Sequence, residues 1–270
     1  MTQHRKGPAL LKRTVMCLAL GLCLAVTSMA PLQARRGQTG IQGNDDREIV
    51  DSQGRPWQSI GRVNNNGRSF CTGVLISDRE VLTAAHCLRS HVAGRAWAPP
   101  SALHFLAGYT RGSYLEYSGV SAISIVPSKP GLSKYDSDFA ILTLTSGIGR
   151  KIGFLPLEKF DRSHWLADQK RGVTYSQAGY SQDRAHILTR NATCSITGFS
   201  EDGNLFMHNC DATHGDSGSP ILARRGSGYS IVGIHVASSR TGGNSIAVAG
   251  LTIAKGLMAM APGLPLAQLR

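Results

Sequence analysis

Short apolar runs separated by turn-forming residues make up most of the chain after residue 56. From Trp57 onward, stretches of mostly apolar residues alternate with clusters of Gly, Pro and Asn. Runs of this length bounded by such clusters are typical of strands in an all-β sandwich or barrel. The predicted strands are 73–76, 80–83, 122–126, 139–144, 220–223 and 230–236, and the predicted turns include 64–67, 99–100, 127–131, 224–228 and 241–244.

Helical patterns and repeats contribute little to this picture. Weak helical periodicity occurs only at 251–260, and no motif repeats along the chain. About 215 residues follow residue 55, enough for a substantial core in one domain or in two packed β-subdomains.

The N-terminal region has the pattern of an export signal. Four basic residues and no acid lie within 1–13, an uncharged apolar run fills 15–30, and the stretch from Pro31 ends at Ala34. This order describes a secretory signal peptide, and the run is short for a membrane span, which needs about 20 residues. We predict a signal peptide at 1–34 and export to the periplasm or the medium, with a retained anchor as the alternative.

Charge and composition suggest how the rest of the chain is organised. Removing 1–34 leaves 25 basic and 17 acidic residues, a net charge of +8. The basic residues are scattered and are not interleaved with aromatic ones, so they favour acidic partners only weakly and give no case for nucleic-acid binding. Residues 35–55 are predicted to be a mature N-terminal segment or a short pro-segment, and 56–270 the folded domain.

The cysteines predict disulfide bonds. Four remain after removal of the signal, and an even number in an exported chain indicates two disulfides with three possible pairings. Nearness in sequence favours Cys71–Cys87 and Cys194–Cys210. Each would close a loop of about 15 residues, worth roughly 3 kcal/mol. The cysteines lack the C-x-x-C spacing of zinc sites, and we expect no metal or cofactor.

Two distant segments carry the candidate chemistry. Leu82-Thr83-Ala84-Ala85-His86-Cys87 offers a histidine, and Gly215-Asp216-Ser217-Gly218-Ser219-Pro220 offers a serine on a glycine-rich turn. Serine is a poor nucleophile at neutral pH unless a base removes its proton and donors hold the oxyanion formed by its attack. The pair therefore indicates nucleophilic catalysis by serine.

These segments, with Asp138-Phe139-Ala140-Ile141-Leu142 between them, resemble the signature blocks of the chymotrypsin/trypsin-like serine proteases. The resemblance extends over about residues 50–260 and includes 71–76. The order His, Asp, Ser separates this family from subtilisins and α/β-hydrolases. The resemblance implies an all-β fold of two packed six-stranded antiparallel β-barrels with the active site in the cleft between them.

Within the family, the chain is most similar to the bacterial V8-like, or glutamyl endopeptidase, branch. The Cys194–Cys210 bridge and the Ser219-Pro220 ending of the serine block are in keeping with it. In the family such bridges would brace the segments holding the histidine and the serine.

The resemblance assigns a role to each catalytic residue. Ser217 is the nucleophile, His86 the base and then the acid, and Asp138 the group that orients the imidazole. Asp136 is a competitor on the same strand face, but the apolar run after Asp138 favours the latter. The backbone N–H groups of Gly215 and Ser217 would form the oxyanion hole.

The residues of the primary substrate pocket give conflicting indications. The resemblance places Asp211 at the base of the pocket, where an aspartate in trypsins binds Arg or Lys. Gly233-Ile234-His235 is similar to the strand of glutamyl endopeptidases whose histidine contacts the substrate glutamate. We favour Glu or Asp before the cut, with Arg or Lys as the runner-up. His235 as a satisfied core residue also stays open.

Asp216 raises the question of activation. In trypsin-like zymogens the aspartate before the nucleophile pairs with a newly freed N-terminus, and Arg47-Glu48-Ile49-Val50 is an imperfect match to an activation site. The alternative is an Asp216 that is simply hydrogen-bonded in its loop. Both interpretations stay open.

The prediction is therefore an exported serine endopeptidase that cuts polypeptides through an acyl-enzyme. We expect a monomer without stable membrane association once the signal is removed. An inactive homologue serving as a binding module is the alternative from a different class, and the intact triad argues against it. A GDS-type lipase or esterase is disfavoured, since His86 and Asp138 precede the serine.

Overall fold

A computed structural model of the chain describes residues 39–92, 94, 96–127, 133–239 and 243–260. The chain divides into two units, Met1–Arg36 and Gly37–Arg270. The predicted signal peptide at 1–34 lies outside the described residues. Everything below concerns the second unit.

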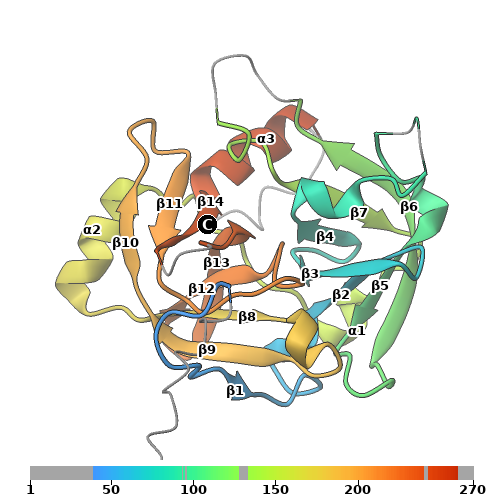
Figure 1. Cartoon of the computed structure of the whole chain (residues 1–270), viewed down its shortest axis with the longest axis horizontal. Coiled ribbons are helices and arrows are strands. Elements are labelled where there is room, and N and C mark those ends of the chain that lie inside the picture. Colours follow the sequence, from blue (N-terminus) through green and yellow to red (C-terminus); the bar gives the residue numbers. More distant parts are fainter. Residues whose placement is uncertain (1–38, 93, 95, 128–132, 240–242, 261–270) are drawn as a thin grey trace, which may run out of the picture. The chain divides into compact units, whose positions relative to one another are not determined.

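Six strands of this unit form a closed antiparallel barrel, on the right in Figure 1. Its core is filled by strand residues such as Val74, Leu82, Phe105 and Leu142, all fully buried. In barrel order the strands are β2 (Ile60–Asn65), β3 (Ser69–Leu75), β4 (Glu80–Thr83), β7 (Ala140–Leu144), β6 (Glu116–Ile125) and β5 (Leu103–Ala107).

The other strands form an eight-stranded sheet, on the left in Figure 1. Only Ser195 separates β9 from β10, although the two strands belong to opposite ends of the sheet order, so this one segment bends the sheet round. The order is β1 (Glu48–Ile49), β9 (Thr189–Cys194), β8 (Tyr175–Gly179), β12 (Pro220–Arg225), β13 (Gly228–Ala237), β14 (Ser245–Ala249), β11 (Leu205–His208) and β10 (Ile196–Phe199).

The all-β fold with two strand assemblies that the sequence predicts is confirmed. The second half differs in detail from the expected six-stranded barrel, because it is a curled half-barrel of eight strands. Each predicted strand lies within or overlaps an observed one. In the predicted turn at 64–67, Asn65 still belongs to β2, and the reversal is made by Asn66 and Gly67, whose φ angles are 50° and 65°.

Of the helices, the sequence predicted only the last. Helix α3 (Gly250–Met260) is present, but α2 (Arg162–Arg171) was missed. Helix α2 has almost no apolar face, and its ends define it instead: Asp161 accepts a hydrogen bond from the His164 N–H, and Gly172 adopts the left-handed conformation that ends helices. The shorter helices are α1 (Gly149–Ile152), η1 (Trp57–Ser59), η2 (Ala85–Leu88), η3 (Pro100–Ala102) and η4 (Gln182–Arg184). Among the described residues, no helix is long and apolar enough to cross a membrane.

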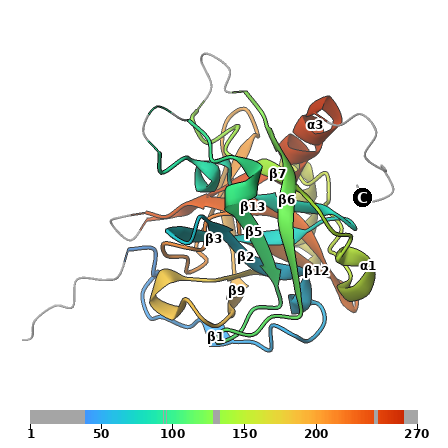
Figure 2. The same ribbon diagram turned by 90° about the vertical axis from the view of Figure 1, so that its right-hand side faces the viewer.

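The segment before residue 50 is packed against the second sheet. Strand β1 pairs with β9, beside which it lies in both views (Figures 1 and 2). Further upstream, the Gly40 carbonyl accepts a hydrogen bond from the Ala212 N–H at 2.9 Å. A Cβ at Gly40 would lie 1.8 Å from the Ala212 oxygen, so only glycine allows this approach. The N-terminal segment therefore reaches the loop that carries the candidate nucleophile.

Candidate active site

The three predicted catalytic residues come from both halves of the fold. His86 lies on η2, directly after β4, and Asp138 lies just ahead of β7. Both therefore belong to the closed barrel. Ser217 lies in the loop before β12, on the second sheet.

His86 and Asp138 are joined by two hydrogen bonds. Asp138 Oδ2 lies 2.7 Å from His86 Nδ1, and Asp138 Oδ1 accepts the His86 backbone N–H at 2.8 Å. Because a carboxylate only accepts, Nδ1 carries the proton and Nε2 is left with a lone pair. The geometry thus gives His86 the tautomer that a general base for Ser217 requires.

Ser217 and Gly215 line a cavity of about 390 Å³ together with His86. His86 also borders a second hollow of about 700 Å³, whose lining includes Trp97 and Val236. The imidazole is partly exposed, with 37% of its side-chain surface accessible.

Two peptide groups beside Ser217 are held so that their N–H groups stay available. The His214 carbonyl accepts the Gln182 N–H at 2.6 Å, and the Asp216 carbonyl accepts the Ser219 N–H at 2.8 Å. In a trans peptide the N–H points opposite to the carbonyl, so the N–H groups of Gly215 and Ser217 face away from these contacts. Within the described part of the chain, neither N–H donates a hydrogen bond to the protein.

Gly215 itself is required by this geometry. Its φ angle is +95°, and an added Cβ would lie 2.5 Å from the Tyr180 carbonyl oxygen. Thr72, on β3 of the barrel, donates its hydroxyl to the Gly215 carbonyl at 3.0 Å and accepts the Tyr180 N–H at 2.9 Å. The Thr72 N–H also reaches the Ser217 carbonyl at 3.0 Å. One threonine therefore ties the barrel to the nucleophile loop.

Asp136, the sequence competitor of Asp138, lies elsewhere. Its Oδ2 accepts the Ser133 N–H, and its buried Oδ1 has no hydrogen-bond partner among the described residues. It borders a different cavity, beside α3. Burial raises the pKa of its carboxyl group. The structure therefore brings Asp138, and not Asp136, to His86.

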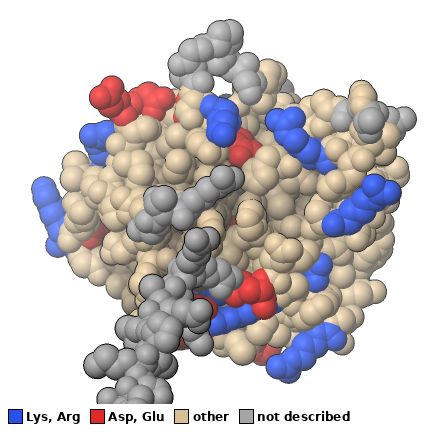
Figure 3. Space-filling model, in the orientation of Figure 1, with Lys and Arg blue, Asp and Glu red and all other residues tan. Residues whose placement is uncertain are grey.

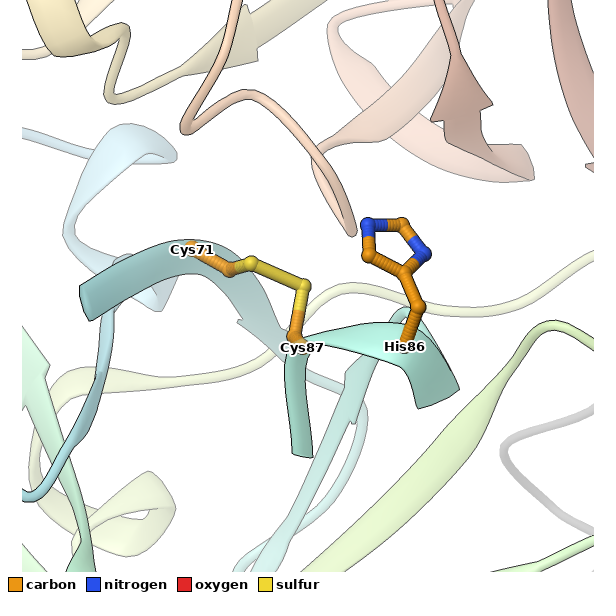
Figure 4. A group of neighbouring side chains, drawn as sticks. All are labelled: Cys71, His86 and Cys87. Carbon is orange, nitrogen blue, oxygen red and sulfur yellow. A yellow bond between two sulfur atoms is a disulfide. The ribbon is translucent and has the colours of Figure 1, made fainter. Parts of the chain in front are cut away.

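Both expected disulfides are present. Cys71–Cys87 joins β3 to η2 beside His86 (Figure 4), and Cys194–Cys210 joins the end of β9 to the start of the nucleophile loop. The sulfurs of Cys71 and Cys87 and a ring nitrogen of His86 lie within 4.8 Å of one another. This cluster is not a thiolate metal site, because its two sulfurs are bonded to each other.

Asp211 contacts the N-terminal segment. Its Oδ1 accepts the Gln42 N–H at 2.6 Å and its Oδ2 accepts the Asp46 N–H at 3.4 Å. The residue is 2% exposed, and burial raises the pKa of its carboxyl group. The carboxylate that the resemblance placed at the base of the substrate pocket is thus engaged by backbone donors.

His235 belongs to a buried chain of hydrogen bonds. His208 Nδ1 accepts the Cys210 N–H, so His208 Nε2 carries the proton and donates to His235 Nδ1 at 3.1 Å. His235 Nε2 then donates to Ser238 Oγ at 3.1 Å, and that hydroxyl donates to the Ala212 carbonyl. Burial lowers the pKa of His208 to about 3 and that of His235 well below its ordinary value, so both rings are neutral.

Asp216 is buried next to the nucleophile, with 1% of its surface exposed. Its Oδ2 accepts the Ser181 hydroxyl at 2.6 Å and the Thr213 N–H at 2.7 Å, and its Oδ1 accepts the Gln177 amide at 3.2 Å. Burial raises the pKa of Asp216 to about 6, although these donors and the charge of Arg47 oppose the rise.

Sequence reasoning missed several residues that shape the site. Thr72 lies within 71–76, a stretch that already resembled the family, and this was the one indication in the sequence that it matters for the site. The others carried no local signature, because each becomes relevant only through a partner far along the chain; they are Ser181, Gln182, His208 and Ser238.

The charged side chains around the two hollows are mostly basic. Arg68, Arg89 and Lys134 border them, together with His91 and His214. The only acidic residue among the described lining is Asp138, which is paired with His86. Elsewhere, on the face shown in Figure 3, Lys and Arg stand apart from one another.

Comparison with known proteins bears on the family of the chain. A family model described as Trypsin matches residues 45–253. The chain is 26% identical over 225 residues to tissue-type plasminogen activator of Sus scrofa, covering 68% of this chain and 38% of that protein. It is 25% identical over 203 residues to glutamyl endopeptidase of Bacillus licheniformis, covering 73% of this chain and 59% of that protein. The chain thus spans less than two thirds of either relative.

A solved structure supports the fold. The chain resembles a Glu endopeptidase in complex with MPD with a TM-score of 0.65 and 22% identity, over 82% of this chain and 98% of the other. Since the family model covers most of the chain and the strand topology agrees with it, the chain belongs to the trypsin family of serine proteases.

Proposed function

We propose that the protein is an exported serine endopeptidase that hydrolyses peptide bonds through an acyl-enzyme. The observation that carries this proposal is the double contact of Asp138 with His86, which in the neutral ring leaves the lone pair on Nε2, and His86 lines a cavity that Ser217 also lines. Export is supported by the signal pattern at 1–34 and by the two disulfides.

In the proposed reaction, Ser217 Oγ attacks the substrate carbonyl carbon while His86 Nε2 takes the hydroxyl proton. Asp138 stabilises the imidazolium, and the N–H groups of Gly215 and Ser217 hold the oxyanion. His86 then gives the proton to the leaving amine, which breaks the peptide bond. Water, deprotonated by His86, releases the acid product and restores Ser217.

We also propose a preference for Glu or Asp before the cut. The carboxylate of Asp211 is engaged by two backbone donors and therefore offers less to a substrate Arg or Lys. Ser238, backed by His235 and His208, is a half-buried hydroxyl that can turn from the Ala212 carbonyl toward a substrate carboxylate. The basic lining of both hollows and the similarity to a glutamyl endopeptidase point the same way.

Two measurements test these proposals. A fluorophosphonate probe should label the folded wild type but not Ser217→Ala, and absence of labelling would favour the inactive binding module. A peptide panel that varies only the residue before the cut should give the highest kcat/KM for Glu. Faster cleavage after Arg would establish the Arg/Lys alternative instead.

A further inference from the structure

Arg47 is a buried cation with an unusual set of contacts. Its side chain is 1% exposed, and its guanidinium binds Asp45 at 2.8 Å and Asp183 at 2.7 Å. Burial alone would lower the pKa of Arg47, but the two carboxylates outweigh burial and raise it. The residue is thus permanently charged and fixed in place, although it belongs to the N-terminal segment.

One hydroxyl connects Arg47 to the nucleophile loop. Ser181 Oγ accepts a hydrogen bond from Arg47 Nη1 at 2.8 Å and donates its own proton to Asp216 Oδ2 at 2.6 Å. A hydroxyl that accepts from a cation is a stronger donor to a carboxylate. The buried charge of Asp216 is therefore matched by the charge of Arg47 across a single oxygen atom.

The same arginine also holds the other side of the loop. Its partner Asp183 lies on η4 and accepts the Thr213 hydroxyl at 3.1 Å. Gln182, also on η4, donates its N–H to the His214 carbonyl and so aims the Gly215 N–H. The contacts of Arg47 thus bear on both peptide groups that present the candidate oxyanion donors.

We propose that Arg47 is a positioning residue of the active site, which holds the loop 213–217 in working geometry through Ser181 and Asp183. This inference rests on the proposed function, because Arg47 can position only an active site that catalyses the proposed reaction. The N-terminal segment that carries Arg47 is held on both sides. Upstream, Asp211 accepts hydrogen bonds from the backbone of Gln42 and Asp46, and downstream β1 pairs with β9.

Two variants and one matched control test this role. Ser181→Ala removes the link to Asp216 but leaves the ion pairs of Arg47, and Arg47→Gln removes the charge. Arg190→Gln is the control, because Arg190 pairs with Glu48 of the same segment and does not contact η4 among the contacts described. Turnover should be normalised to the concentration of sites titrated with a burst substrate, so that folding losses do not count.

Both test variants should lose about 10- to 100-fold in kcat with KM little changed, as expected when catalytic donors are slightly misplaced. Arg47→Lys should recover part of the loss, and Arg190→Gln should stay within about twofold of wild type. Wild-type kcat in folded Ser181→Ala would overturn the inference, even if Arg47→Gln failed to fold.

The pH dependence separates positioning from a merely structural role. The charged groups nearest to Asp216 are Arg47 on the N-terminal segment, which reaches it through Ser181, and Asp183 on η4, which shares Thr213 with it. Its other neighbours are neutral: Gln177 on β8 and Ser219 just before β12. In Arg47→Gln the NMR titration midpoint of the Asp216 carboxyl carbon should move to higher pH, because Asp216 becomes easier to protonate. An unmoved midpoint would contradict the inference.

The proposed function can fail separately. A folded wild type that neither cleaves peptides nor reacts with the fluorophosphonate would remove the protease proposal. The positioning contact would then still be tested by the NMR titration of the Asp216 carboxyl carbon, whose midpoint should rise in Ser181→Ala. An unchanged midpoint would exclude the contact itself.

Discussion

The two sides of the candidate site are held in different ways. On the barrel side, His86 and Asp138 contact each other directly, and the supporting Cys71–Cys87 disulfide joins residues only 16 apart in sequence. On the other side, the Ser217 loop is held by partners far along the chain, such as Arg47 and Thr72, and by a buried carboxylate.

The difference predicts how each side of the site responds to substitutions at distant residues. The base needs one orientation, which two short hydrogen bonds supply. The nucleophile loop must present two backbone donors at once, and backbone groups have no side chain of their own to fix them. Their positions are therefore set indirectly, through neighbouring carbonyls and a buried charge, so this side should respond to changes at distant residues.

The largest expected effect lies on the barrel side. Asp138→Asn should lower kcat about 10⁴-fold, because the amide favours the wrong imidazole tautomer. Asp136→Asn is the matched control and should leave kcat within about twofold, since Asp136 borders another cavity. Turnover of a peptide substrate by both variants is the measurement. A loss only in Asp136→Asn would reverse the assignment, and equal losses would contradict it.

The fold and the barrel side could be predicted because their determinants are local. The period of apolar runs gave the strands, and His86 and Cys87 are neighbours within one block. Helix α2 was missed because it is defined by Asp161 and Gly172 at its ends and not by an apolar face. The family is confirmed by comparison, whereas the roles of the individual site residues stay predictions.

The nucleophile side could not be predicted to the same extent. Asp216 was open to two interpretations, because its sequence neighbours do not reveal whether Ser181, Thr213 or a freed N-terminus faces it. Likewise, nothing beside Asp211 shows that Gln42 and Asp46 donate to it from more than 160 positions away. The contacts of a buried carboxylate can be predicted only when the positions of the groups that donate to it are also known.

The second prediction concerns the buried charge of Asp216. Its pKa is raised from 3.8 to about 6, so the folded state holds the proton more tightly than the unfolded state. This contribution to stability is present below pH 3.8 and is lost as the pH rises through 6, a change of about 3 kcal/mol. Asp216→Asn has no such proton.

The free energy of unfolding of wild type minus that of Asp216→Asn, measured by urea titration between pH 4 and 7, should therefore fall as the pH rises. The absolute stability of the variant does not matter, because the pH slope of the difference isolates the group. A difference that is constant over this range would show that Asp216 has an ordinary pKa, and would weaken the contrast between the two sides.

Thr72 tests the connection between the two sides. Thr72→Val removes the hydroxyl that fixes the Gly215 carbonyl and leaves the Tyr180 N–H without its acceptor, so kcat should fall about 10-fold. Thr72→Ser keeps the hydroxyl and should retain most of the activity. Site-titrated kcat is the readout. If Thr72→Val matched Thr72→Ser, the Thr72 hydroxyl would not hold the nucleophile loop, and the hydrogen bond from the residue 72 backbone N–H to the Ser217 carbonyl would be the connection that remains.

The smallest effect expected comes from the exposed charges that border both sides. Arg68→Gln and Arg89→Gln should each lower kcat/KM about threefold for peptides with acidic residues flanking the cut, because exposed charges act weakly through water. Arg79→Gln, at the turn between β3 and β4, makes the same change in net charge but borders neither hollow, and it should have no effect. In 1 M salt, where the screening length is about 3 Å, the losses should vanish. A loss that persists in high salt would mean that these arginines contact the substrate directly. Substrate recognition, like catalysis, would then depend on side chains held in fixed positions at this site.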